Sequence, residues 1–350
     1  MPEFHGDAVQ GGFMLAVLQR ANSSRWFGYT ASSLEKCVDL SQLVPSRGSR
    51  SFPMISEGGS AYVIANPRAG RARHKKPMER RPCESERIWA ETEGEGHAES
   101  LAYEASIRGF RWIIAMGGDG TIHEVLNGMI RNANNRSILG VIPAGTANDY
   151  AASFQVTPTD ARAGALRVDV GRLSWRTGSR YFANVAGLGF SGDIANRARR
   201  MLRIPARVRY TLALLRQLGP GYAPKPMSVS LDGGPMIESK TLLVSAALGQ
   251  REGSYPLHAR ADLTDGLFEF LQLGRLSRRE LAWHFPAMLR GVLPRNHSQV
   301  FRRQCRHIRI EAKQTIPVHL DGEFPKGAVE QELNEIDLEV IPGAIEVEML

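Results

Sequence analysis

Short apolar runs that end at turn residues recur along the chain from residue 61 onward. Residues 61–65, 111–116 and 138–143 are such runs, and each stops at a turn rich in glycine, asparagine or proline. Continuous apolar runs bounded by turn residues are typical of buried β-strands. Residues 99–107 are predicted to form a helix. A second helix is expected from residue 122, because apolar residues recur there at spacings of three and four: Ile122, Val125, Leu126, Met129 and Ile130. The repeated order of strand, glycine turn and helix predicts a parallel α/β sheet.

The pattern changes after about residue 167, where strand-like segments follow one another with few helical patterns between them. These segments are residues 181–186, 227–231, 241–247, 267–272, 306–311 and 316–320. They predict a second domain dominated by antiparallel sheet. The last two strand-like segments, residues 336–341 and 345–349, could pair with either domain.

Residues 1–59 differ from both regions. They show weak periodicity and become rich in Ser, Gly and Arg toward their end. We expect a poorly structured extension there.

The net charge of +8 arises entirely after residue 59, because the first 59 residues contain five Lys or Arg and five acidic residues. A basic surface favours phosphates, nucleic acid or an anionic membrane, and charge alone does not choose among them. No apolar stretch reaches the roughly 20 residues needed to span a bilayer. Residues 11–18 are short and follow acidic residues, which makes a poor secretory signal. We therefore expect a cytoplasmic protein with isolated, reduced thiols at Cys37, Cys83 and Cys305.

The turn Gly117-Gly118-Asp119-Gly120-Thr121 is the strongest local signal for chemistry. Glycines let an anion approach backbone N–H groups closely, and a following helix adds the positive end of its dipole. Thr121 could cap that helix or contact phosphate. The turns at residues 66–70 and 143–149 end neighbouring predicted strands at the same sheet edge, where open α/β sheets bind ligands. Three converging turns predict a phosphate-binding site.

Two other nucleotide-binding patterns are excluded. Residues 187–192 match the dinucleotide fingerprint Gly-x-Gly-x-x-Gly, but that fingerprint wants an acidic residue about 20 positions later. Residues 203–222 contain no Asp or Glu, and the chain has no Walker A motif. His97, His123, His258 and His319 are scattered along the chain and indicate no metal site.

Six motifs in order resemble the diacylglycerol kinase catalytic family, which is similar to the sphingosine and ceramide kinases. They are residues 66–70, Thr92 with residues 96–98, residues 117–121, residues 145–149, residues 263–266 and residues 321–323. The resemblance covers roughly residue 61 to the C-terminus. It implies an N-terminal α/β nucleotide-binding domain (residues 60–167, completed by 328–350) and a C-terminal antiparallel β-sandwich domain (residues 168–327) that receives a lipid substrate.

The resemblance also implies an ATP- and Mg²⁺-dependent lipid kinase, most simply acting on diacylglycerol or a related membrane lipid. Glu323 would be the general base, with Asp119 as a second catalytic carboxylate, and Asp262, Asp265 and the backbone of Leu267 would hold magnesium. The ATP site would be formed by Asn66, Pro67, Arg68, Ala69, Gly70, Thr92, Gly117, Gly118, Asp119, Gly120, Thr121, Ile122, His123, Glu124, Thr146 and Asn148. Where the family often has Asn and a run of glycines, this chain has Gly249-Gln250-Arg251-Glu252-Gly253.

Residues 194–231 contain no acidic residue, and arginines crowd their first half. They form either a solvated helix face or a docking surface for anionic lipid headgroups, through which the protein would contact the membrane peripherally. Residues 281–293 are too short to cross a bilayer and are expected in the core or in an acyl pocket. The sequence leaves a homodimer open.

Three alternative functions compete with the lipid kinase. NAD kinase shares the Gly-Gly-Asp-Gly-Thr turn, but its Asn-Glu motif lies in mid-chain, whereas Asn334-Glu335 lies near the end here. A catalytically idle regulator that binds lipid or nucleotide would not need the carboxylates of Asp119, Asp265 and Glu323. A nucleic-acid partner is not expected, because the arginines are not interleaved with aromatic residues.

Overall fold

The computed structural model describes residues 60–70, 87–154, 164–201, 206–217, 223–288, 290, 292, 297–328 and 333–350. The extension predicted over residues 1–59 lies outside the described residues. In the part that the structure describes, no helix is long and apolar enough to cross a bilayer.

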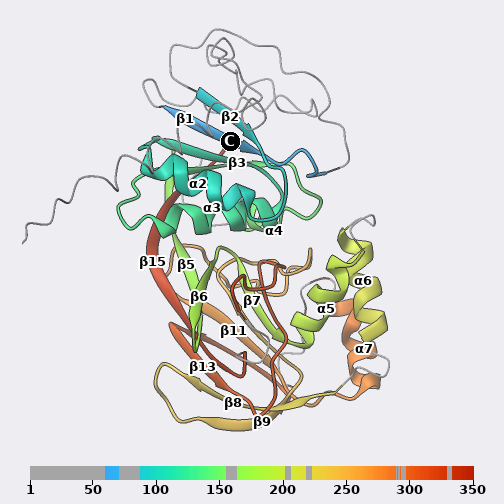
Figure 1. Ribbon diagram of the computed structural model, residues 1–350. Coiled ribbons are helices and arrows are strands. Elements are labelled where there is room, and N and C mark those ends of the chain that lie inside the picture. The colour runs from blue at the N-terminus through green and yellow to red at the C-terminus, as the bar shows by residue number, and fades with distance from the viewer. Residues whose placement is uncertain are drawn as a thin grey trace, which may run out of the picture.

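The upper lobe in Figure 1 is a parallel sheet in the order β2, β1, β3, β4. Its strands are β1 (Ala61–Ala65), β2 (Arg87–Glu91), β3 (Trp112–Gly117) and β4 (Ile138–Pro143). The first and last strands match their predicted ranges, and β3 is shifted by one residue. No strand was predicted at β2, because polar and apolar residues mix there. The helices of this lobe are α2 (His97–Ile107), α3 (Asp119–Arg131) and α4 (Asp149–Phe154).

The long strand β15 (Glu335–Met349) joins the two lobes. Its last residues pair in parallel with β4, and its remainder pairs antiparallel with β5 (Leu166–Trp175) and β13 (His307–Glu311). The two predicted C-terminal strands are therefore one strand that serves both lobes, with a register shift between Ile341 and Ile345. Pro342, which has no N–H to donate, and Gly343, with φ of +54°, lie at this bulge.

The lower lobe packs two antiparallel layers face to face. One layer continues the first sheet through β15, β13, β8 (Lys225–Leu231) and β9 (Ile237–Thr241), with β5 and β6 (Gly178–Phe182) beside it. The second layer has the order β12, β11, β10, β7, β14. These strands are β7 (Val185–Gly189), β10 (Leu243–Ala247), β11 (Phe268–Leu273), β12 (Val300–Cys305) and β14 (Val318–Leu320). Phe182 of one layer stacks on Phe268 of the other, with ring centroids 5.8 Å apart. An α/β lobe with an antiparallel β-sandwich confirms the predicted fold class.

Two predicted strands are divided in the structure. Residues 181–186 break between β6 and β7 because the backbone N–H groups of Ala183 and Asn184 donate to the carboxylate of Asp321 rather than to a neighbouring strand. Residues 241–247 break at Leu242, where the chain passes from one layer to the other. Leu242 is bonded there to Leu273 and Phe190.

Three helices beside the sandwich were largely unpredicted. They are α5 (Phe190–Arg199), α6 (Ala206–Gln217) and α7 (Arg278–Met288), which gather on one side of the lower lobe in Figure 1. Phe190 and Leu281 from these helices pack in a buried cluster with Leu242, Leu271 and Leu273. The rejected fingerprint match at residues 187–192 lies where β7 meets α5, and Gly192 there serves packing: a Cβ on it would lie 2.3 Å from the Pro317 carbonyl oxygen.

Helices α2 and α3 touch where Gly128 faces Glu99. A Cβ on Gly128 would lie 2.2 Å from the Glu99 carbonyl oxygen, which is a backbone atom that cannot move aside alone. Alanine normally stabilises an exposed helix position relative to glycine by about 1 kcal/mol. At Gly128 the collision with the Glu99 carbonyl should make the change to alanine destabilising instead.

We expect Gly128→Ala to lower the free energy of unfolding by roughly 1–3 kcal/mol, measured by urea denaturation, because it overpacks the α2–α3 contact. Gly94→Ala is the matched control, because no heavy atom lies within 4 Å of the Cβ it would carry. A Gly128→Ala protein as stable as the wild type would contradict this packing.

Candidate active site

The turns that follow β1, β3 and β4 pack directly against one another. A Cβ on Gly70 would lie 2.6 Å from the Ala144 carbonyl oxygen, and one on Gly145 would lie 2.4 Å from the Gly118 Cα. The Asn66 side-chain amide donates to the Thr121 hydroxyl at 3.1 Å. The convergence predicted for these turns is thus present, and only glycine fits at the contacts.

Helix α3 begins at Asp119, three residues before the predicted start at Ile122. Gly118 is its N-cap residue, and the Gly118 carbonyl accepts hydrogen bonds from the N–H groups of Thr121 and Ile122. The glycine turn therefore belongs to the first turn of the helix, so the positive end of the helix dipole lies at the loops themselves. The Thr121 hydroxyl was expected to cap this helix or to contact phosphate. It does not cap the helix, and it accepts a hydrogen bond from the Asn66 side chain.

A cavity of about 1140 Å³ opens beside these loops and extends into the lower lobe. It is lined by most of the residues predicted for the ATP site and by the predicted base. These are Asn66, Arg68, Ala69, Gly70, Thr92, Gly118, Asp119, Gly120, Thr121, Ile122, Glu124, Thr146 and Glu323. Four predicted residues lie outside the lining: Pro67, Gly117, His123 and Asn148. Of these, Asn148 shapes its turn, because its side chain exchanges two hydrogen bonds with Gly145.

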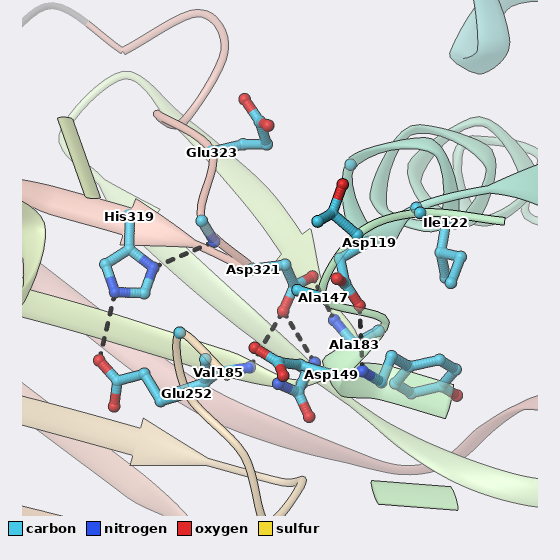
Figure 2. Close-up of a pocket in the computed structure, with 18 of the residues that line it drawn as sticks. Asp119, Ile122, Ala147, Asp149, Ala183, Val185, Glu252, His319, Asp321 and Glu323 are labelled. Carbon is cyan, nitrogen blue, oxygen red and sulfur yellow. Dashed lines mark hydrogen bonds and ion pairs between the residues drawn. The ribbon is translucent and has the colours of Figure 1, made fainter. Parts of the chain in front are cut away.

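Glu323 faces the glycine loop from the other lobe. Its Oε1 lies 3.1 Å from the position of a Cβ on Gly120. A tight turn carries it: Leu320 and Glu323 exchange backbone hydrogen bonds, and Asp321 and Gly322 between them have φ of +53° and +89°. Two residues with positive φ are the signature of a two-residue hairpin turn. Figure 2 shows Glu323 and Asp119 on facing sides of the site.

Asp321 anchors this turn inside the protein. Its carboxylate accepts hydrogen bonds from the backbone N–H groups of Ala183, Asn184 and Val185 at 2.9–3.0 Å; Figure 2 labels Asp321, Ala183 and Val185. It also contacts His123 at 3.0 Å. Burial acts to raise the pKa of Asp321, but the bonds from His123 and the backbone lower it below its usual value. The carboxylate thus stays charged, and it fixes Glu323, two residues away.

His123 connects Asp321 to a buried chain of polar groups. The Arg180 Nε–H donates to His123 Nε2 at 3.3 Å, so the ring proton must lie on Nδ1, which donates to Asp321. Arg180 also pairs with Glu99 of α2 at 2.7 Å. His123 supports the turn that carries Glu323, and its place in the ATP site, which the resemblance implied, stays a prediction. Sequence reasoning missed Arg180, whose partners lie far away in sequence.

Asp119 and Asp149 place two carboxylates side by side at the loops. Burial raises the pKa of Asp119 to about 6, and the neighbouring charge of Asp149 adds to the rise. The Tyr150 N–H donates to Asp119 Oδ1 at 3.0 Å. Burial and the nearby charge of Asp149 disfavour the ionised form of Asp119, and a cation bound between the two carboxylates would offset this cost. Asp119 therefore fits a magnesium ion, which favours carboxylate oxygens together with phosphates.

The predicted magnesium loop lies elsewhere. Asp262 and Asp265 are outside the cavity lining, and the Asp262 carboxylate accepts from both the N–H and the hydroxyl of Thr264. Burial raises the pKa of Asp265, and the charges of Asp262 and Asp169 add to this. Within the described ranges, no group of three or more His, Cys, Asp or Glu side chains could hold a metal ion. The magnesium role of Asp262, Asp265 and Leu267 stays a prediction.

The segment in which this chain departs from the family pattern contributes two charged residues to the site. The Arg251 Nε–H donates to Asp149 at 3.3 Å, and the Ser254 N–H donates to the same carboxylate at 2.7 Å. The Glu252 side chain lines the cavity and contacts His258 and His319. Sequence reasoning treated these histidines as unrelated, although the structure brings them to one carboxylate.

The far end of the cavity is apolar. It is lined by side chains of α5, α6, α7 and the adjoining strands: Phe190, Ile194, Leu214, Leu242, Leu243, Leu271, Leu273 and Leu281. Leu281 confirms that part of the segment 281–293 lines an apolar pocket, whereas Trp283 is 82% exposed. The cavity therefore runs from polar glycine loops, past carboxylates, to an apolar chamber.

An α/β lobe whose glycine loops face an acidic turn and an apolar chamber is the architecture of a two-lobed kinase. The diacylglycerol kinase catalytic domain matches residues 60–173, and the YegS C-terminal NAD kinase beta sandwich-like domain matches residues 184–349. In keeping with both matches, the chain belongs to the diacylglycerol kinase catalytic family of lipid kinases.

Relatives agree with this assignment. The chain is 29% identical over 282 residues to the diacylglycerol kinase of Bacillus subtilis, covering 75% of this chain and 89% of that protein. It is 33% identical over 241 residues to a "Probable lipid kinase YegS-like" of Chromohalobacter salexigens, covering 65% and 74%. A crystal structure of a diacylglycerol kinase from Bacillus anthracis shares the fold with a TM-score of 0.59 at 20% identity, over 83% of this chain and 96% of that chain.

The raised pKa of Asp119 means that its ionisation opposes folding when no cation is bound. The native carboxyl keeps its proton up to about pH 6, whereas the unfolded one loses it near 3.8. Stability therefore falls as the pH rises from about 4 to about 6 and then stays level. Replacing Asp119 by Asn removes this loss.

We expect Asp119→Asn to match the wild type in urea denaturation near pH 4 and to be more stable above pH 6, by up to about 3 kcal/mol. Glu238→Gln, at an exposed position of β9, should show no such pH-dependent gain. A gain that is equal at both pH values would contradict the assignment.

Proposed function

We propose that the protein transfers the γ-phosphoryl group of Mg-ATP to a hydroxyl group of a membrane lipid, of which diacylglycerol is the simplest candidate. ATP would bind at the loops after β1, β3 and β4, and the acceptor would lie in the apolar chamber. Functionally, residues 60–167 with 328–350 would hold the nucleotide, and residues 168–327 would hold the lipid.

One observation carries the proposal. Gly120 of the glycine loop and Glu323 of the opposite lobe meet across the same cavity, with 3.1 Å between Glu323 Oε1 and the Gly120 Cβ position. A phosphoryl group held by the loop would face a carboxylate able to take a proton. An alcohol is a weak nucleophile, so a base within hydrogen-bond reach helps as charge develops on its oxygen.

The remaining residues act on position and charge, which dominate phosphoryl transfer. Magnesium would be held by Asp119 with the phosphates and would neutralise their charge. The helix α3 N-terminus and the loop N–H groups would bind phosphate oxygens. Asp321 and His123 would keep Glu323 aligned with the loop, because Asp321 belongs to the turn that carries Glu323 and His123 contacts Asp321 from inside the protein.

Glu323→Gln should lower kcat for lipid phosphorylation by roughly 10²–10⁴-fold while leaving the dissociation constant for ATP nearly unchanged, because the amide keeps the shape and loses the base. The assay offers labelled ATP and Mg²⁺ with diacylglycerol, phosphatidylglycerol, a sphingoid base, an isoprenoid-linked alcohol and NAD as separate acceptors. Glu238→Gln is the control. If NAD became labelled and no lipid did, the lipid-kinase proposal would be overturned. If Glu323→Gln kept full activity, Glu323 could not be the general base.

The same proposal places the helices of the lower lobe against an anionic membrane. Trp283 of α7 is 82% exposed, and exposed arginines precede it at Arg275, Arg278 and Arg279. On the same helix, Leu281 lines the apolar chamber. Tryptophan beside cationic side chains is typical of surfaces that lie in a membrane interface. Arg200 is exposed as well, while the side chains of Arg199 and Arg203 lie outside the described part.

Trp283→Ala should weaken binding to vesicles of phosphatidylglycerol and phosphatidylcholine by roughly tenfold, with an unchanged melting temperature, because the indole has no core to support. Vesicle sedimentation at low and high salt measures this. Ile237→Ala, a 64% exposed residue on the edge strand β9, is the matched control. Equal losses in both variants would mean that α7 does not meet the membrane.

A further inference from the structure

A buried carboxylate with four side-chain partners lies between Glu323 and the apolar chamber. Glu252 Oε2 contacts the hydroxyl of Ser245 at 2.7 Å and Nε2 of His258 at 3.0 Å. Its Oε1 contacts the Ser191 hydroxyl and, at 3.3 Å, Nε2 of His319. Ser245 and His258 are fully buried, whereas Ser191, Glu252 and His319 line the cavity (Figure 2 shows Glu252 and His319).

The protons of this cluster can be assigned from its backbone contact. The Gly322 N–H donates to His319 Nδ1 at 3.1 Å, so Nδ1 carries no proton and the ring is neutral with its proton on Nε2. His319 Nε2 lies 3.0 Å from Ser191 Oγ. Because Nε2 is the donor in that pair, the Ser191 proton must point to Glu252. Ser191 Oγ thus donates once, accepts once and keeps one lone pair.

A hydrolytic role for Ser191, His319 and Glu252 is excluded by the same assignment. In a serine nucleophile system the imidazole nitrogen facing serine takes the serine proton, and the acid contacts the other nitrogen. Here the nitrogen facing Ser191 already holds a proton, and Glu252 contacts that same nitrogen. The group offered to the cavity is an acceptor oxygen polarised by a carboxylate.

Ser191 Oγ lies between the apolar chamber and the turn that carries the proposed base. Ser191 follows Phe190, which lines the apolar chamber, and His319 is bonded to Gly322, the neighbour of Glu323. A lipid with its chains in the chamber and its reacting hydroxyl near Glu323 would pass Ser191 with the next part of its headgroup. A hydroxyl or amino group of the headgroup could donate a hydrogen bond to Ser191 Oγ, whereas a headgroup oxygen without a hydrogen would find no donor there.

We propose that Ser191, backed by Glu252 and His319, forms a subsite for a second hydrogen-bond donor on the acceptor lipid, next to the hydroxyl that is phosphorylated. The preferred acceptor class is then a vicinal diol or amino alcohol. This inference rests on the proposed lipid-kinase function and narrows the acceptor: diacylglycerol, whose neighbouring oxygen is an ester that cannot donate, would be a poorer acceptor than a lipid with a second donor. Glu252 belongs to the segment in which this chain departs from the family pattern.

The test uses three single-chain acceptors of equal length in mixed micelles: a long-chain primary alcohol, the matching vicinal diol and the matching vicinal amino alcohol. The wild type should favour the diol or the amino alcohol over the plain alcohol by roughly 10- to 100-fold in kcat/KM, the range of a hydrogen bond to a charge-backed partner. Ser191→Ala should reduce that ratio to near one. Ser239→Ala, whose hydroxyl bonds to Thr241 and Gln272 outside the cavity lining, should keep it.

Glu252→Gln separates the two donor types, because loss of the negative charge should weaken the amino alcohol more than the diol. Dissociation constants of the same acceptors, measured by titration without ATP, give a readout that needs no turnover, and melting temperatures report the fold of each variant. Wild-type protein that treats all three acceptors alike, or Ser191→Ala that keeps the preference, would overturn the subsite. A binding preference without phosphorylation of any lipid would instead overturn the kinase proposal and leave the subsite standing.

Discussion

The site depends on one buried carboxylate. Asp321 accepts hydrogen bonds from three consecutive backbone N–H groups at the break between β6 and β7 and from His123 of the other lobe. Leaving such donors unpaired inside the protein is costly, so the turn that carries Glu323 has one favourable position. The distance between Glu323 and the glycine loop is therefore set by a hydrogen-bond network that faces away from the cavity.

The chemistry of the cavity changes along its length in an order that suits its proposed reaction. Backbone N–H groups and a helix N-terminus lie at one end, carboxylates follow, and apolar side chains from α5, α6, α7 and β11 close the other end. Asp119 has a raised pKa because it is buried next to Asp149, so this part of the protein is electrostatically unfavourable when empty. Unfavourable electrostatic energy of this kind is common at sites that bind a charged ligand. Arg251 offsets part of it on the Asp149 side.

The sequence predicted the local features well and the long-range ones poorly. Strands at residues 61–65 and 138–143 are short apolar runs between turns, which is a pattern that needs no tertiary information. The convergence of the three glycine turns followed from parallel-sheet geometry. By contrast, β2 mixes polar and apolar residues, and the roles of Arg180 and His123 arise from partners more than 50 residues away. The cluster of Glu252, His258 and His319 could not be recognised, because isolated histidines carry no signal until the fold brings them together.

Strand β15 belongs to both lobes, since it pairs with β4 at one end and with β5 and β13 along the rest. A strand paired on both sides of a single bulge resists bending more than a linker would. The two lobes are thus poorly suited to a wide jaw-like opening between catalytic cycles. If the chamber holds acyl chains as proposed, their exchange is better served by its side, where α5, α6 and α7 form a wall of separate helices.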